Sequence, residues 1–75
     1  MKKLIIIGGY GNGTVAQSTV EDINNRVPEW ELLGFLNDRE TDRINGYPVL
    51  GKVDKDTVDV YLEDPEVYFF YSLIS

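Results

Sequence analysis

The sequence predicts a small α/β fold, in which parallel strands and crossover helices form three layers. Three observations lead to this prediction: strand-like and helix-like segments alternate, the first strand-like run is continuously apolar, and a glycine-rich turn follows it directly. Alternating strands and helices favour a parallel sheet with crossover helices, and a short apolar run is typical of a strand buried on both faces. We place one domain over residues 1–75, because this length allows no more.

The first half of the chain predicts a strand, a helix and a second strand. Leu4–Ile7 is the first expected strand. A helix is expected next, because four apolar residues recur at helical spacing: Ala16, Val20, Ile23 and Val27. Asn24-Asn25 and then Pro28 end this pattern. The second strand is expected at Trp30–Leu36, where apolar and aromatic residues predominate.

The middle of the chain predicts loops and then a short helix. Arg39–Arg43 is polar and is expected to be a loop. Ile44–Gly51 is rich in turn-forming residues, with a brief extended piece expected at Val49-Leu50. Asp54 is a suitable N-cap for a helix over Lys55–Glu63. The residues of this helix expected to face the core are Val58, Tyr61 and Leu62.

The third strand is expected at Val67–Ile74, which is dense in aromatic and branched residues. Right-handed crossovers limit the topology, and we predict the strand order 2-1-3 with a helix on each face. This is a small Rossmann-like sheet, in which the glycine-rich turn lies where the strand order reverses and where open α/β sheets bind ligands. Because the chain stops after an apolar strand, we expect it to be one piece of a longer protein.

Composition and charge exclude several kinds of function. The chain has no cysteine and no histidine, so it lacks thiolates, disulfides and the commonest metal ligand, and we expect no metal site. Its net charge of −6 argues against a nucleic-acid partner. No apolar run is long enough to span a bilayer, and no secretory signal is recognisable. We therefore expect no membrane partner and a cytoplasmic location.

The glycine-rich turn from Gly8 to Gly13 is the main candidate binding site. A strand that ends in glycine and leads into a helix lets backbone N–H groups converge on an anion. Glycine is needed there for close approach or for positive φ. The strict dinucleotide pattern is absent because Thr14 stands where its third glycine belongs, and no Gly-Lys-Ser/Thr motif for ATP hydrolysis occurs. The alternative is a tight strand-to-helix turn that holds no ligand.

Asn37 and Asp38, which end the second strand, are the other candidates. Asp38 follows Gly13 by 25 residues, and an acid near that spacing accepts hydrogen bonds from a ribose hydroxyl in nucleotide-binding α/β folds. Asn37 can donate to a base or sugar oxygen. The alternatives are a solvated loop aspartate and a turn asparagine. Ser72 and Ser75 are near the same edge, but they have no histidine partner, and no catalytic residue is expected.

Three segments together resemble the N-terminal domain of bacterial sugar acyltransferases, of the bacillosamine N-acetyltransferase and sialic acid O-acetyltransferase type (PglD/NeuD-like). These segments are Lys3–Gly13, Trp30–Asp38 and Ile44–Gly51, and the resemblance covers nearly the whole chain. It implies a Rossmann-like domain that holds a nucleotide-linked sugar, usually a UDP-sugar, as the acceptor substrate. In this family a C-terminal left-handed β-helix binds acetyl-CoA, supplies the catalytic histidine and forms a homotrimer.

The resemblance also implies roles for individual residues. Tyr10, Gly11 and Asn12 would lie at the phosphates and sugar of the nucleotide, and Asn37 and Asp38 would meet the uridine. Asn12 stands where many members have histidine, and Asn37 replaces the first acid of an Asp-Asp pair. This chain would need no cofactor of its own, acetyl-CoA being expected for the longer enzyme, and would not be catalytic alone.

Two other interpretations remain open. One is half of a regulatory domain that binds NAD or CoA, although dinucleotides need two mononucleotide halves and only one fits in this chain. The other is a structural or interaction module with an empty turn. Comparing the binding of NAD with that of UDP-sugars separates the first from the acyltransferase interpretation, and an absence of binding to either supports the second.

Overall fold

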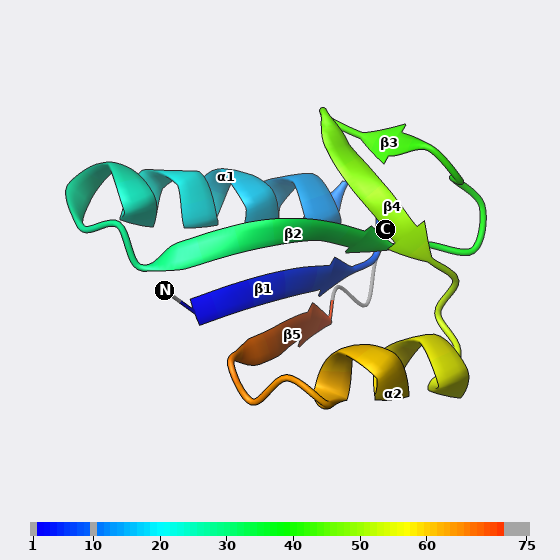
Figure 1. The fold of residues 1–75 in the computed structure, drawn as a ribbon. Helices are drawn as coiled ribbons and strands as arrows, with labels where there is room; N and C mark the ends of the chain where they lie inside the picture. The colour runs from blue at the N-terminus through cyan, green and yellow to red at the C-terminus, as the bar shows by residue number, and fades with distance from the viewer. Residues whose placement is uncertain (1, 10, 72–75) are drawn as a thin grey trace.

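The computed structural model describes residues 2–9 and 11–71, and these form one five-stranded sheet with two helices (Figure 1). In chain order the elements are β1 (Lys2–Ile7), α1 (Asn12–Arg26), β2 (Trp30–Leu36), β3 (Arg43–Ile44), β4 (Tyr47–Gly51), α2 (Lys55–Leu62) and β5 (Val67–Tyr71). The strand order is β3-β4-β2-β1-β5. The pairs β4–β2, β2–β1 and β1–β5 are parallel, and only the β3–β4 pair among the described strands is antiparallel.

The three strands expected from the sequence are β2, β1 and β5, which are neighbours in that order. The sheet is nevertheless larger than predicted, because β4 and β3 extend it beyond β2. The prediction of a loop through Arg43 was therefore wrong at its last residue, and the extended piece at Val49-Leu50 belongs to a complete strand. The part of the third predicted strand after Tyr71 lies outside the described residues.

A tight hairpin turn adds these two strands. Asn45 and Gly46 have φ values of 51° and 88°, the combination that two-residue hairpins require. The turn lets β3 fold back on β4, with Ile44 opposite Tyr47. β4 then runs parallel to β2, with Val49 opposite Phe35. The turn-forming residues that suggested a loop are thus the corner of a hairpin.

The two helices cover opposite faces of the sheet. The β1–α1–β2 connection moves across the sheet in one direction and the β4–α2–β5 connection returns in the other, so right-handed crossovers put the helices on opposite faces. Figure 1 shows α1 alongside β2 and α2 on the other side of the strands, near β5. Neither helix in the described part of the chain is long and apolar enough to cross a membrane.

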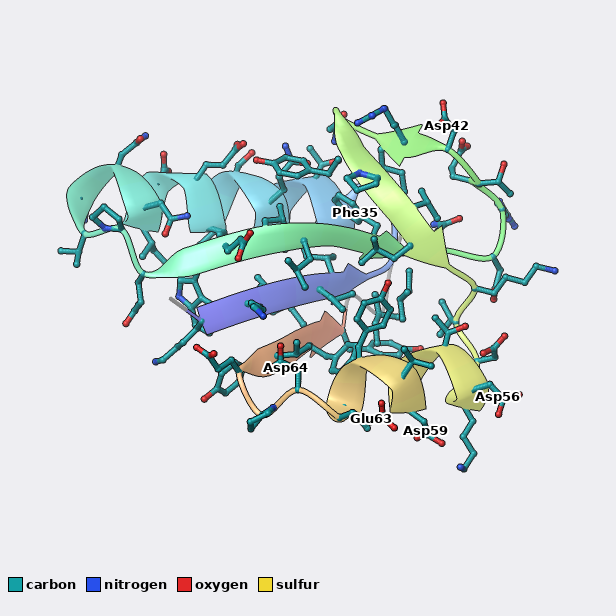
Figure 2. All side chains as sticks on the ribbon, in the orientation of Figure 1. Phe35, Asp42, Asp56, Asp59, Glu63 and Asp64 are labelled. Carbon is teal, nitrogen blue, oxygen red and sulfur yellow. The ribbon has the colours of Figure 1, made fainter. Side chains whose placement is uncertain are left out.

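The larger part of the core lies between the sheet and α1. Its buried members are Leu4, Ile6, Ala16, Val20, Phe35 and Ile44, and Figure 2 shows Phe35 near the end of β2, close to β4. On the α2 face, Ile5 and Leu36 are fully buried. Apolar periodicity overestimated how many side chains of the two predicted helices are buried, since Ile23 is 39% exposed, Val27 is 66% exposed and Leu62 is 55% exposed.

Side-chain hydrogen bonds fix the start of α2 and the connection that follows α1. Asp54 accepts a hydrogen bond from the Thr57 amide over 2.8 Å, which confirms the predicted N-cap of α2. This bond to the backbone lowers the pKa of Asp54. In the last turn of α1, the Asn24 side chain donates to the Trp30 carbonyl over 2.6 Å and accepts from the amides of Glu29 and Trp30. Asn24 therefore joins the last turn of α1 to the start of β2.

A bulge in β2 sets the register of the sheet. Leu4 of β1 lies opposite Leu32, but the next residue, Ile5, lies opposite Gly34. Gly34 has a φ of 153°, and a Cβ there would clash with the carbonyl oxygen of Pro48 in β4. After the bulge, Phe35 and Leu36 are both fully buried, one on each face of the sheet, and Leu36 pairs with Ile7, so β2 ends beside the end of β1.

Candidate functional site

The glycine-rich turn connects the carboxyl end of β1, which lies between β2 and β5, to the start of α1. The amide of Gly8 donates to the Leu36 carbonyl over 3.0 Å, so the turn begins as a continuation of the sheet. Gly8 has a φ of 147° and Gly11 a φ of 86°. Gly11 combines this φ with a ψ of −120°, a backbone conformation that residues other than glycine rarely adopt.

One further glycine, Gly9, is required by a close contact. A Cβ on Gly9 would lie 2.6 Å from the Asn37 side-chain nitrogen, so this position must remain without a side chain while Asn37 keeps its place. A Cβ on Gly13 would lie 3.4 Å from the Phe35 ring, an ordinary van der Waals contact, so the first turn of α1 lies directly on the core without requiring glycine there. Gly9 thus lets the turn pass close to the Asn37 side chain just after β2.

The start of α1 has the electrostatic character of an anion site. Gly11 is the N-cap residue and supplies no side-chain cap, and the first turn has no acidic residue. The described residues provide no acceptor for the amides of Gly11 and Gly13. These amides, together with the dipole of a 15-residue helix, leave partial positive charge at the turn.

Asn37 has a structural role at this edge. Its side-chain nitrogen donates to the Gly8 carbonyl over 2.9 Å, and its side-chain oxygen accepts from the amides of Arg39 and Glu40 over 2.8 and 2.7 Å. It therefore ties the end of β1 to the loop after β2. Both lone pairs of its oxygen are in use, which leaves one N–H of the amide group for a further partner.

Asp38 is exposed, and its carboxylate is bound by the segment that precedes α2. One of its carboxylate oxygens accepts from the Val53 amide over 2.9 Å, which links the end of β2 to the segment before α2. The second carboxylate oxygen has no hydrogen-bond donor among the described residues. Asp38 thus combines a structural bond with an available acceptor at the same edge of the sheet.

The predicted site residues are only partly brought together. Asn37 contacts the turn directly through Gly8, whereas no described hydrogen bond joins Asp38 to the turn. Asn12 is the first residue of α1. Tyr10, Ser72 and Ser75 lie outside the described residues, so their predicted places stay predictions.

The sequence interpretation missed Gln17, one turn into α1. Gln17 is only 8% exposed, and its side-chain oxygen is buried without a hydrogen-bond partner in the described structure. The available signal was its position, since it lies four residues after Gly13 and three before Val20 and so shares their buried side of the helix. A second missed contact joins Asn45 of the hairpin turn to Thr14 in the first turn of α1, over 2.9 Å.

Comparison with known proteins agrees with this architecture. The family model described as the PglD N-terminal domain matches residues 3–71, which include almost all of the sheet and both helices. No curated protein and no solved structure gives a significant match. The family match covers well over half of the chain and confirms the resemblance found in the sequence. The chain therefore belongs to the PglD N-terminal domain family, a family related to sugar acetyltransferases.

Proposed function

We propose that this domain binds a nucleotide-linked sugar, first of all a UDP-sugar, with its diphosphate at the start of α1. One observation carries the proposal: the amides of Gly11 and Gly13 have no acceptor among the described residues, and no carboxylate occupies the first turn. Phosphate groups bind at such helix ends because the N–H groups and the helix dipole both favour negative charge. Membership of the PglD N-terminal domain family supports a sugar as the rest of the ligand.

The proposed role is that of an acceptor site and not of a complete enzyme. The chain has neither histidine nor cysteine, so a base or nucleophile of those types has to come from elsewhere. Following the family resemblance, we assign acetyl-CoA binding, the catalytic histidine and trimer formation to a C-terminal β-helix of a longer enzyme. This domain would then hold the sugar so that its amino or hydroxyl group reaches the acetyl donor.

Asn37 and Asp38 are proposed to contact the nucleoside. Asp38 has one carboxylate oxygen available beside the one that accepts from Val53, and such an oxygen can accept from ribose hydroxyls or from a base N–H. Asn37 has one N–H available beside the one that donates to Gly8. Their bonds within the chain support this role by holding both residues at the carboxyl edge of β2.

Isothermal titration calorimetry with UDP-N-acetylhexosamines, UDP and NAD tests the proposal. Two substitutions that introduce opposite charges at Val15 form a matched pair of variants, because this side chain is 62% exposed and follows the first turn of α1. Val15→Glu should stabilise the helix by about 0.3–1 kcal/mol and weaken binding several-fold, and Val15→Lys should do the reverse. Both binding effects should shrink at high salt. Gly11→Val is less suitable, because its φ of 86° would strain the fold itself.

The outcomes separate the interpretations. UDP-sugar binding that is insensitive to the charge at position 15, while stability responds to it, would place the ligand away from α1. Tighter binding of NAD than of UDP-sugars would favour the dinucleotide interpretation, and a folded chain that binds none of them would favour a structural module. Asp38→Asn keeps an acceptor for the Val53 amide, so it should weaken UDP-sugar binding without loss of stability.

A further inference from the structure

Asn37 is the first residue after β2, at the place where the carboxyl ends of β1, β2 and β4 lie side by side (Figure 1). Its backbone amide donates to the Gly51 carbonyl at the end of β4 over 3.0 Å. The residue before it, Leu36, accepts at its carbonyl from the amide of Gly8, which follows β1. Asn37 therefore lies at the junction from which the glycine-rich turn leaves the sheet.

The hydrogen bonds of the Asn37 side chain fix which of its atoms faces the turn. One atom accepts from the amides of Arg39 and Glu40 over 2.8 and 2.7 Å, which only the side-chain oxygen can do. The NH2 group is therefore directed at the Gly8 carbonyl, which accepts from it over 2.9 Å. A carboxylate in this place would set a second acceptor against that carbonyl, so the contact requires an amide.

The same NH2 group packs against the backbone of Gly9. A Cβ on Gly9 would lie 2.6 Å from the Asn37 nitrogen, whereas its next contacts, at 3.7 and 3.8 Å, would be ordinary van der Waals contacts. Gly9 is not among the glycines with positive φ, so its own backbone conformation does not require glycine. A methyl group at this position would therefore conflict with Asn37 and with little else.

The turn has few other side-chain contacts that fix its path. Gly8 and Gly11 have positive φ, and glycine has more conformational freedom to lose than any other residue. Among the described residues, no side chain other than Asn37 hydrogen-bonds to Gly8, Gly9 or Gly11. The path of the chain from the end of β1 to the first amides of α1 thus depends on this contact.

We propose that Asn37 is a positioning residue for the phosphate groups of the ligand, because it holds Gly8 and Gly9 so that the amides of Gly11 and Gly13 face the same anion. This inference rests on the proposed phosphate site at the start of α1, and it gives Asn37 a role that needs no contact with the ligand. Donors that are already ordered bind more tightly than donors that must be ordered on binding. The affinity for the phosphate part of the ligand alone should therefore depend on Asn37.

Titration with inorganic pyrophosphate, followed by the amide NMR spectrum of the chain, tests this role, because pyrophosphate has no nucleoside for Asn37 to contact. Asn37→Ser keeps an oxygen that can accept from the following amides but lacks the NH2 group. Its dissociation constant for pyrophosphate should rise about fivefold, the change expected from one lost hydrogen bond. Asn24→Ala is the matched control, because it removes three side-chain hydrogen bonds at the opposite end of α1, and it should leave this constant unchanged. Equal constants for Asn37→Ser and the parent chain, or equal losses in both variants, would overturn the positioning role.

Gly9→Ala disturbs the same contact from the side of the turn and completes a double-mutant cycle. Alone it should weaken pyrophosphate binding by a similar factor, because its methyl group displaces the NH2 group of Asn37. Added to Asn37→Ser it should have little further effect, since the nitrogen that it would strike is absent. Effects of the two substitutions that simply multiply would show that the contact between them is not the cause.

Backbone order parameters from NMR relaxation of the ligand-free chains measure the turn directly. We expect those of Gly9 and Gly11 to fall in Asn37→Ser but not in Asn24→Ala, and unchanged values in Asn37→Ser would refute the inference even if the affinity fell. A parent chain that binds pyrophosphate as tightly as Asn37→Ser contradicts this inference alone. A parent chain that binds neither pyrophosphate nor UDP-sugars contradicts the proposed function, and this inference with it.

Discussion

Replacing Gly34 with alanine should remove most of the stability of this domain. Gly34 lies at the bulge of β2 with a φ of 153°, and its Cβ would be driven into the carbonyl oxygen of Pro48. Neither side can move easily, because Phe35 and Leu36 beside it are fully buried. The substitution therefore combines two penalties, an unfavourable backbone conformation and a clash with a neighbouring strand.

The size of the effect follows from these two penalties. A positive φ in an L-residue costs about 1–3 kcal/mol, and relieving the clash requires β4 to separate from β2 at the bulge. We expect a total of about 4 kcal/mol or more, which is exceptional for a single substitution. A domain of this length has a total stability of about 4–11 kcal/mol. Gly34→Ala should therefore be largely unfolded or lose tens of degrees in Tm.

Gly46→Ala is the matched control, because Gly46 also has a positive φ, 88°, but no atom lies within 4 Å of the added Cβ. It should lose only the conformational part, about 1–2 kcal/mol. Urea unfolding followed by circular dichroism measures both variants against the parent chain. If Gly34→Ala lost no more stability than Gly46→Ala, the argument that the strand contact at the bulge dominates would be wrong.

Three further predictions concern single side chains. Asn24→Ala should cost about 2 kcal/mol in urea unfolding, because three hydrogen bonds to the start of β2 are lost, whereas exposed Asn25→Ala should have little effect. Gln17→Met should raise stability by about 1 kcal/mol, since it removes the buried oxygen that lacks a partner; a loss of stability would mean that this oxygen is satisfied. Lys3→Met removes the 2.7 Å ion pair with Asp64, which lowers the pKa of Asp64 and raises that of Lys3. Because the pKa of Asp64 is lowered, the ion pair stabilises the fold at any pH above the ordinary pKa of an aspartate. The difference in free energy of unfolding between the parent and Lys3→Met should therefore disappear as the pH falls below about 4. Because the pKa of Lys3 is raised, this difference in free energy of unfolding should disappear again in strong alkali, where Lys3 loses its charge. A difference that stays unchanged across acid pH would contradict the ion pair.

Local features account for what could be predicted from the sequence. The run before Gly8, the spacing of Ala16 and Val20, and Asp54 as a cap each depend on neighbours within a few residues. Glycines in the turn signalled a backbone conformation that Gly11 indeed adopts. These local features and the three resembling segments were sufficient for the fold class and for the family.

Contacts between distant segments account for the rest. The segment around Asn45 looked like a loop in the sequence, because β4 becomes a strand of the sheet only through its pairing with β2. That pairing joins separate segments of the chain and leaves no local signal. The exposure of Leu62 was missed because periodicity marks the apolar side of a helix but not how much of it a small sheet can cover. Asn37 likewise looked like a ligand or an ordinary turn residue, and its bond to Gly8, 29 positions away, exists only once β1 and β2 lie side by side.

The sequence by itself thus determined β1, β2, β5, the two helices, the glycine turn and the family of this protein, since backbone conformation and periodicity are set by residues close together in the chain. Only the tertiary structure decided which strands join at the edges of the sheet, which polar atoms find partners, and which apolar residues stay exposed. The physical reason is that hydrogen bonding and burial depend on which distant segments the fold brings into contact.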